Sequence, residues 1–197
     1  MRQYLRLMLL VIAVISVSGC GYNAIQQKDE AVKAGWSEVV NQYKRRADLI
    51  PNLVETVKGF ARQEQETLTA VIEARAKATS IQVDASTLDN PEQLQQFQQA
   101  QNQLTGALSR LMVVSERYPE LKSNQNFLAL QSQLEGTENR IAVARRDFIA
   151  AVERYNTEIR TFPGRIWHTL MYSDMPIRET FEATAQNAEQ APQVKFQ

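Results

Sequence analysis

The sequence predicts an all-α fold: an up-and-down antiparallel bundle of long helices with a Pro-kinked N-terminal arm and a short C-terminal extension. The chain of 197 residues contains only seven Gly and six Pro, a composition that favours long helices. Apolar side chains recur every three or four residues over long stretches, as they do on one face of a helix. Turn-forming residues gather in the short intervals between these stretches.

The first 19 residues have the pattern of a secretory signal peptide. Arg2 and Arg6 precede an uncharged apolar run from Leu7 to Val17, and small residues follow up to Gly19. The apolar run has about 11 residues, well short of the roughly 20 that span a bilayer. We therefore expect residues 1–19 to be removed as a signal peptide and not retained as a transmembrane anchor.

Cys20 is the only cysteine in the chain and follows Val17-Ser18-Gly19. The string resembles a bacterial lipobox, in which the cysteine sulfur is lipidated and the signal is cut before it. The alternative is a free thiol, because a lone exported cysteine has no partner for an internal disulfide. We expect acyl chains such as palmitate on Cys20 to anchor the protein to a membrane, with residues 20–28 as the lipidated N-terminus and linker.

The mature chain is expected to be nearly neutral. Loss of Arg2 and Arg6 reduces the 22 basic residues against an unchanged 22 acidic residues. Without a basic excess, the sequence gives no reason to expect nucleic acid as a partner. Gly21 follows Cys20, and in a Gram-negative cell the absence of Asp there implies sorting to the outer membrane, facing the periplasm.

The N-terminal arm is expected to be one long helix with a bend. An apolar stripe runs before Pro51 and continues after it; its positions are Val32, Trp36, Val39, Tyr43, Ala47, Ile50, Leu53, Val57, Phe60, Leu68, Val71 and Arg75. Proline removes one helical hydrogen bond and its ring presses on a preceding carbonyl, so the helix kinks or restarts. We expect this bend to let the arm follow the bundle, with Lys44, Arg45 and Arg46 on its outer faces.

Two further long helices follow a predicted loop at residues 79–89. Asn90-Pro91 is a helix start, and the helix it opens ends near Tyr118. The turn of residues 119–123 is short, which makes its flanking helices antiparallel neighbours. The last long helix, residues 124–162, carries a heptad-like seam with one stutter near Phe148. Pro163-Gly164 ends that helix, so we expect a bundle of residues 29–163 and short helices and a tail over residues 164–197.

The segment from Gln93 to Leu104 contains seven glutamines. Because its apolar residues keep helical spacing, the glutamines are expected to form a neutral solvated face, or alternatively a face that pairs with another coiled-coil protein.

The residue types required by common catalytic and metal sites are missing. His168 is the only histidine and is expected to lie partly exposed in a short C-terminal turn. One histidine and one cysteine cannot build a zinc site, and neither a nucleophile elbow nor a phosphate-binding glycine loop is present. The sequence therefore predicts no enzymatic activity, no metal and no cofactor.

Five sequence blocks together point to a known family. They are Tyr-Asn at 22–23, KRRADLIPNLVETVKGFARQE at 44–64, EARAKA at 73–78, the run at 116–145 that begins ERYPELKSNQNF, and VERYNTEIRTFPG at 152–164. With these blocks the chain resembles the LemA family of bacterial envelope proteins. The resemblance implies an all-α bundle on the extracytoplasmic side, attached at its N-terminus, and assigns no activity to particular residues. The motifs Phe181-Glu182, Pro192 and Val194-Lys195-Phe196 match the family's tail. A tail phenylalanine is expected to clip onto its own bundle or to be offered to a partner.

Two functional hypotheses follow: a lipid-anchored helical adaptor for another envelope protein, or a self-assembling scaffold on the membrane surface. Ile166, Trp167, Leu170, Met171 and Tyr172 form a dense apolar group that suits either a partner contact or a cap over the bundle end. The candidate partner-binding residues are Tyr43, Arg45, Arg46, Asp48, Pro51, Asn52, Trp167, Tyr172 and Phe196.

Overall fold

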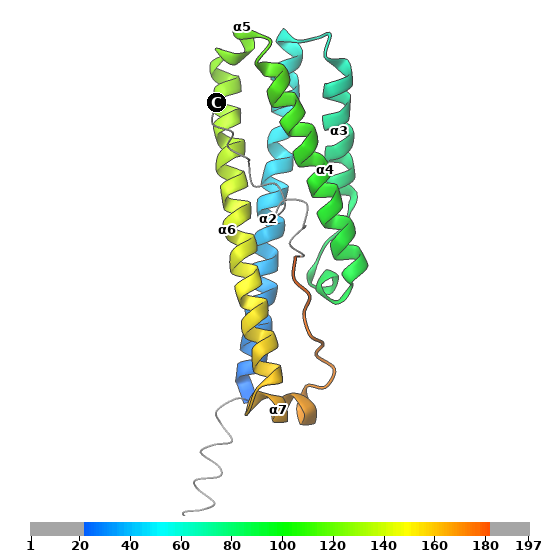
Figure 1. Ribbon diagram of the computed structural model, residues 1–197, viewed down its shortest axis with the longest axis vertical. Coiled ribbons are helices and arrows are strands. Elements are labelled where there is room, and N and C mark those ends of the chain that lie inside the picture. The colour runs from blue at the N-terminus through cyan, green and yellow to red at the C-terminus, as the bar shows by residue number, and fades with distance from the viewer. Residues whose placement is uncertain (1–21, 182–197) are drawn as a thin grey trace, which may run out of the picture.

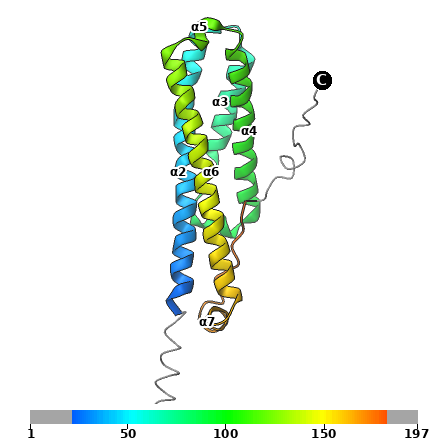
Figure 2. The same ribbon diagram turned by 60° about the vertical axis from the view of Figure 1, so that its left-hand side comes forward.

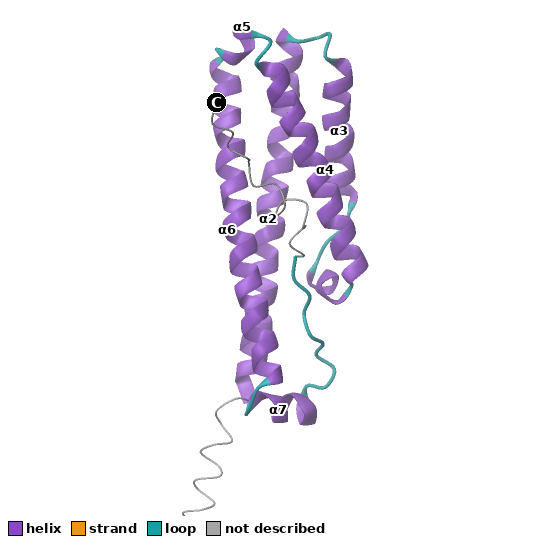
Figure 3. Cartoon of the chain, viewed as in Figure 1, coloured by secondary structure: helices purple, strands orange, loops and turns teal. Residues whose placement is uncertain are grey.

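The computed structural model describes residues 22–181. In this range the chain forms helices and connecting loops without a strand (Figure 3), so the predicted all-α fold is confirmed. The predicted signal peptide, Cys20 and Phe196 lie outside the described residues. The elements are α2 (Tyr22–Phe60), α3 (Gln65–Ser80), the 3-10 helix η1 (Ala85–Asp89), α4 (Pro91–Ser115), α5 (Pro119–Lys122), α6 (Gln125–Arg160) and α7 (Gly164–Met171).

The long helices run up and down, as predicted (Figures 1 and 2). Helices α2 and α6 lie side by side over almost their whole length, and α3 and α4 form a second pair beside the half of the bundle that is capped by α5. Helix α7 lies across the opposite end, where α2 begins. From there the chain returns along the bundle towards α4.

The prediction of one continuous N-terminal arm reaching Arg75 is wrong. Helix α2 passes through Pro51 but ends at Phe60, and α3 then runs back in the opposite direction. The turn is secured by Glu64, whose carboxylate accepts hydrogen bonds from the Tyr118 hydroxyl at 3.0 Å and from Arg117 at 3.1 Å. Phe60, which was placed on the buried stripe, is exposed.

Helix α2 tolerates Pro51 because another residue supplies the missing hydrogen bond. A residue with an N–H at position 51 would donate to the carbonyl of Ala47, four residues earlier, and proline cannot. In its place Arg75 Nε, from α3, donates to the Ala47 oxygen at 2.8 Å. The proline ring itself is exposed, so the helix continues without a buried carbonyl left unpaired.

The other helix boundaries agree closely with those predicted from the sequence. The Asn90 side chain accepts from the backbone N–H of Gln93 at 3.1 Å at the start of α4. Asn124 accepts from Asn126 and Phe127 at 3.0 and 3.1 Å at the start of α6. The predicted loop is present, although α3 extends into it as far as Ser80 and η1 lies within it.

The core consists of two apolar clusters stacked along the bundle. The cluster nearer α7 centres on Trp36, which packs against Phe97, Phe148 and Phe181 with ring centroids 5.5 to 5.8 Å apart. The indole N–H donates to the Asp84 carbonyl at 2.8 Å. The second cluster, between α2, α3, α4 and α6, consists mainly of aliphatic residues. Most of the α6 seam is buried as predicted, but Phe162 beyond its end is exposed.

The C-terminal extension is tied to the bundle by a buried ion network. Arg178 donates to Asp29 at 2.7 and 3.2 Å and pairs with Asp89, and its backbone exchanges two hydrogen bonds with the Asn156 side chain. Burial by itself raises the pKa of Asp29, but hydrogen bonds from Lys33 and Arg178 outweigh it and hold that pKa below its ordinary value. The network therefore fixes the segment that delivers Phe181 into the core, where Phe181 clips onto its own bundle.

Candidate partner-binding groove

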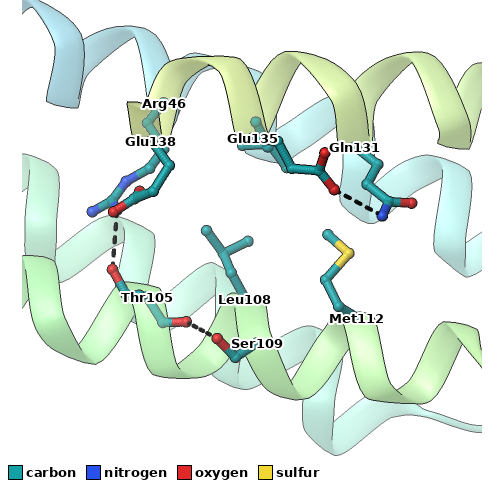
Figure 4. Close-up of a pocket in the computed structure, with 9 residues that line it drawn as sticks. Arg46, Thr105, Leu108, Ser109, Met112, Gln131, Glu135 and Glu138 are labelled. Atoms are coloured by element: carbon teal, nitrogen blue, oxygen red, sulfur yellow. Dashed lines mark hydrogen bonds and ion pairs between the residues drawn. The ribbon is translucent and has the colours of Figure 1, made fainter. Parts of the chain in front are cut away.

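A groove with a volume of about 240 Å³ lies between α4 and α6 (Figure 4). It exists because α4 pairs with α3 while α6 pairs with α2, so α4 and α6 flank an open interval. Its floor is apolar and consists of Leu108 and Met112 from α4 and Leu134 from α6. These residues belong to the apolar stripes of their helices, here at the edge of the core and not at its centre.

Arg46 of α2 closes one end of the groove. Its side chain donates to Glu138 Oε2 at 2.8 Å, Thr105 Oγ1 at 3.0 Å and Gln101 Oε1 at 2.8 Å. Its guanidinium carbon also lies 5.1 Å from the centre of the Tyr43 ring, within range of a cation–π contact. A single side chain thus connects α2, α4 and α6.

The prediction that Arg46 lies on an outer face is wrong, because only 2% of the residue is exposed. It follows Tyr43 by three residues and precedes Ile50 by four, so it occupies the inward face of α2. That spacing was visible in the sequence, but a cation is almost never fully buried unless it is paired. The partners that make burial possible come from α4 and α6, far away in the chain.

The rim of the groove is polar, with carboxylates on the α6 side. Glu135 and Glu138 are exposed, and Gln131 donates to Glu135 at 3.0 Å. Thr105 and Ser109 form the α4 side. The groove therefore combines an apolar floor with acidic groups that are accessible to a basic partner.

The remaining candidate residues fall into two groups. Tyr43 and Tyr172 are buried and Trp167 is half-buried against the core; burial raises the pKa of the Tyr43 phenol. Arg45, Asp48, Pro51 and Asn52 are exposed on α2. This second group keeps a surface available for a partner, whereas Tyr43 and Tyr172 serve packing.

The described residues include neither a candidate metal site nor a candidate membrane-spanning helix. His168 lies in α7, half-buried, with Nε2 at 2.8 Å from the Met175 carbonyl. Within residues 22–181, no group of three or more His, Cys, Asp or Glu side chains is arranged to hold a metal ion. In the same range, no helix combines the length and apolar character needed to cross a bilayer.

The structure defines the class of this protein as an all-α helical bundle. A family model described as the LemA family matches residues 35–196. The chain therefore belongs to the LemA family, as its sequence blocks indicated.

The chain is also similar to curated proteins, at 23% to 28% sequence identity. The chain is 28% identical over 181 residues to the magnetosome proteins MamQ 1 and MamQ 2 of Paramagnetospirillum magneticum, a match that covers 83% of this chain and 65% of each relative. It is 23% identical over 140 residues to Protein LemA of Metamycoplasma hominis, covering 71% of this chain and 60% of that protein. The chain thus spans less than two thirds of the length of these relatives.

Proposed function

We propose that this protein is a non-enzymatic adaptor of the bacterial cell envelope, lipid-anchored through Cys20, that binds another envelope protein in the groove between α4 and α6. Membership of the LemA family supports the envelope location. The lipobox-like string supports the anchor, and with Gly21 after Cys20 the location in a Gram-negative cell is the outer membrane, facing the periplasm.

The apolar floor of the groove is the observation that carries this proposal. An amphipathic helix recognises such a groove by placing side chains from one face into it. The volume of about 240 Å³ is below the roughly 300–1,000 Å³ of small-molecule sites. It suits the insertion of a few partner side chains better than the enclosure of a whole ligand.

The acidic rim adds a requirement for the partner. Glu135 and Glu138 stand beside the floor, and Arg46 offsets the charge of Glu138. Exposed rim charges chiefly govern association rate and specificity. We therefore expect the partner helix to present Lys or Arg next to its apolar side chains.

Most of the ionisable groups with a shifted pKa among the described residues lie in or beside the ion network of the C-terminal extension and not among the residues that line the groove. Enzymes tend to gather such groups in a cleft. The shifted pKa values of Asp29 and Arg178 arise instead in the ion network of the C-terminal extension, and burial raises the pKa of Tyr155 beside it to about 12. The pKa shifts of these three groups are therefore explained by their structural role in fixing the C-terminal extension.

In-cell photo-crosslinking tests the proposal. A photoreactive residue at Ser109, on the groove rim, is expected to capture one abundant foreign envelope protein, while the same residue at exposed Arg146 of α6 does not. Met112→Glu, which places a charge in the groove floor, is expected to abolish that capture. The matched substitution Val113→Glu, at the exposed neighbouring position, is expected to preserve it.

Other outcomes contradict the adaptor. Links from Ser109 only to other copies of this chain favour the self-assembling scaffold. Equal capture at Ser109 and Arg146, or capture that survives Met112→Glu, removes the groove from the proposal.

A further inference from the structure

Exposed apolar side chains are concentrated at the α7 end of the molecule. Eleven large apolar side chains are exposed among the described residues, and five of them lie between positions 162 and 177. These five residues form what we call the α7 patch: Phe162, Ile166, Leu170, Met171 and Ile177. Isolated exposed apolar residues are ordinary on protein surfaces, whereas a cluster indicates an interaction surface.

The patch includes the outward side of α7, because its inward side is already occupied. Trp167 packs against the core and Gly164 is buried. Ile166 and Leu170 are four residues apart and so share one helical face, and Leu170 is 69% exposed. Phe162, just before α7, is 77% exposed. The helix therefore has apolar residues on both sides, and one side is left uncovered by the part of the chain from residue 22 to residue 181.

The position of the patch indicates what covers it. Helix α7 packs against the start of α2, and both lie at the same end of the bundle (Figures 1 and 2). Tyr22, the first residue of α2, follows Cys20 by two residues, which span at most about 7 Å. A lipid on Cys20 therefore brings this end of the bundle to the membrane surface.

The charges near the patch also fit a lipid surface. Arg160 and Arg165 are exposed beside it, and the exposed acids of the segment after α7 are Asp174 and Glu179. Cations beside exposed apolar side chains are typical of segments that lie in the membrane interface, where they meet anionic headgroups.

We infer that the α7 patch is a second membrane contact, inserted at the boundary between lipid headgroups and acyl chains. The inference rests on the anchor of the proposed function but not on its groove. A lipid tether alone holds the chain to the membrane and leaves the bundle free to tilt. Insertion of Leu170 and its neighbours fixes the end of the bundle on the bilayer and sets the orientation of α2 and α6.

Site-specific fluorescence on the full-length lipidated protein tests this contact. The lipid occupies the Cys20 sulfur, so Leu170→Cys supplies a single free thiol for a polarity-sensitive fluorophore. Val113→Cys is the matched control: Val113 is 68% exposed but lies near the α5 end of α4. In phosphatidylethanolamine/phosphatidylglycerol vesicles with brominated acyl chains, we expect several-fold stronger quenching at position 170 than at position 113.

A second variant separates insertion from mere proximity to the membrane. In protein labelled at Ile166→Cys, Leu170→Asp is expected to reduce the quenching several-fold, while Val113→Asp leaves it unchanged. Equal weak quenching at positions 170 and 113 overturns the inference. So does shielding of position 170 that depends on protein concentration and not on vesicles, since a second copy then covers the patch.

Lipidation of Cys20 and partner binding in the groove are tested by measurements that do not involve the α7 patch. The intact mass of the protein shows whether Cys20 carries lipid, and crosslinking from Ser109 shows whether the groove binds a partner. If Cys20 carries no lipid, the anchor is refuted, and quenching of the Leu170→Cys label in a Cys20→Ser background, where position 170 holds the single thiol, then tests the patch by itself.

Discussion

Replacing Arg75 by Met should destabilise the protein through the carbonyl of Ala47. This substitution removes the 2.8 Å hydrogen bond that Arg75 Nε donates to that oxygen but keeps much of the aliphatic stem. Ala47 is only 3% exposed, so its carbonyl depends on the Arg75 donor in the folded protein. A hydrogen bond involving a charged group contributes about 1.5–3 kcal/mol, and we expect the free energy of unfolding to fall by about 2 kcal/mol.

A double-mutant cycle with Pro51→Ala isolates the cause. Alanine at position 51 has an N–H that can donate to the Ala47 oxygen in the ordinary helical way. In that background Arg75→Met should cost only about 0.5 kcal/mol, so the coupling between the two positions should be about 1.5 kcal/mol.

Urea unfolding followed by circular dichroism measures all four proteins of the cycle. Lys77→Met, at an exposed position on the same helix, should lie within about 0.5 kcal/mol of wild type. Additive effects at positions 75 and 51, within about 0.3 kcal/mol, would refute the claim that Arg75 compensates for the proline.

Four further substitutions test the ends of the bundle by urea unfolding. Arg178→Ala leaves the buried Asp29 carboxylate with Lys33 as its remaining cationic partner and should cost about 3 kcal/mol. Because the folded pKa of Asp29 is depressed, its contribution is present above its unfolded pKa of about 4 and is lost as the pH falls through the folded value. Lys33 still holds Asp29 in the variant, so this acid sensitivity should be weakened and not abolished. Gly164→Ala forces a methyl group into a backbone carbonyl of α6 and should cost about 2 kcal/mol, whereas Gly59→Ala meets open space and should stabilise by about 0.5–1 kcal/mol. Phe181→Ala should cost about 3 kcal/mol; a loss below about 1 kcal/mol would show that the extension is not part of the core.

The helix starts were predictable because their signals are local. Asn90 and Asn124 cap α4 and α6 with their own side chains, and such caps are visible in a few residues of sequence. The turn after Phe60 was missed because it uses neither Gly nor Pro and is held by Tyr118 and Arg117, more than fifty residues away. Apolar spacing continues across such a turn, so it cannot show that the chain reverses.

The groove could not be predicted, because it depends on which helices pair. Each of its floor residues continues an ordinary apolar stripe, and only the pairing of α4 with α3 leaves that stripe accessible. The burial of Arg46 has the same origin, since Glu138, Thr105 and Gln101 meet it only in the folded bundle. The link between Arg178 and Asp29 joins positions 149 residues apart and leaves no local pattern at all.

The two proposed contacts together constrain where a partner can bind. Glu135 on the groove rim precedes Arg160, at the α7 end of α6, by about 25 residues, which corresponds to about 37 Å of helix. The headgroup layer on one side of a bilayer is only about 5–8 Å thick. With the α7 patch on the membrane and α6 upright, the groove stands well clear of the lipid.

A partner consisting only of membrane-spanning helices cannot reach the groove in that orientation. We therefore expect the crosslinks from Ser109 to map to an extramembrane helical segment of the partner that extends at least about 30 Å from the bilayer, as the rise of α6 requires. Leu170→Asp should release the bundle from its upright orientation and spread those crosslinks over more partner positions. Crosslinks from Ser109 into a membrane-spanning segment would contradict the upright arrangement, even if the groove proves to be the binding site.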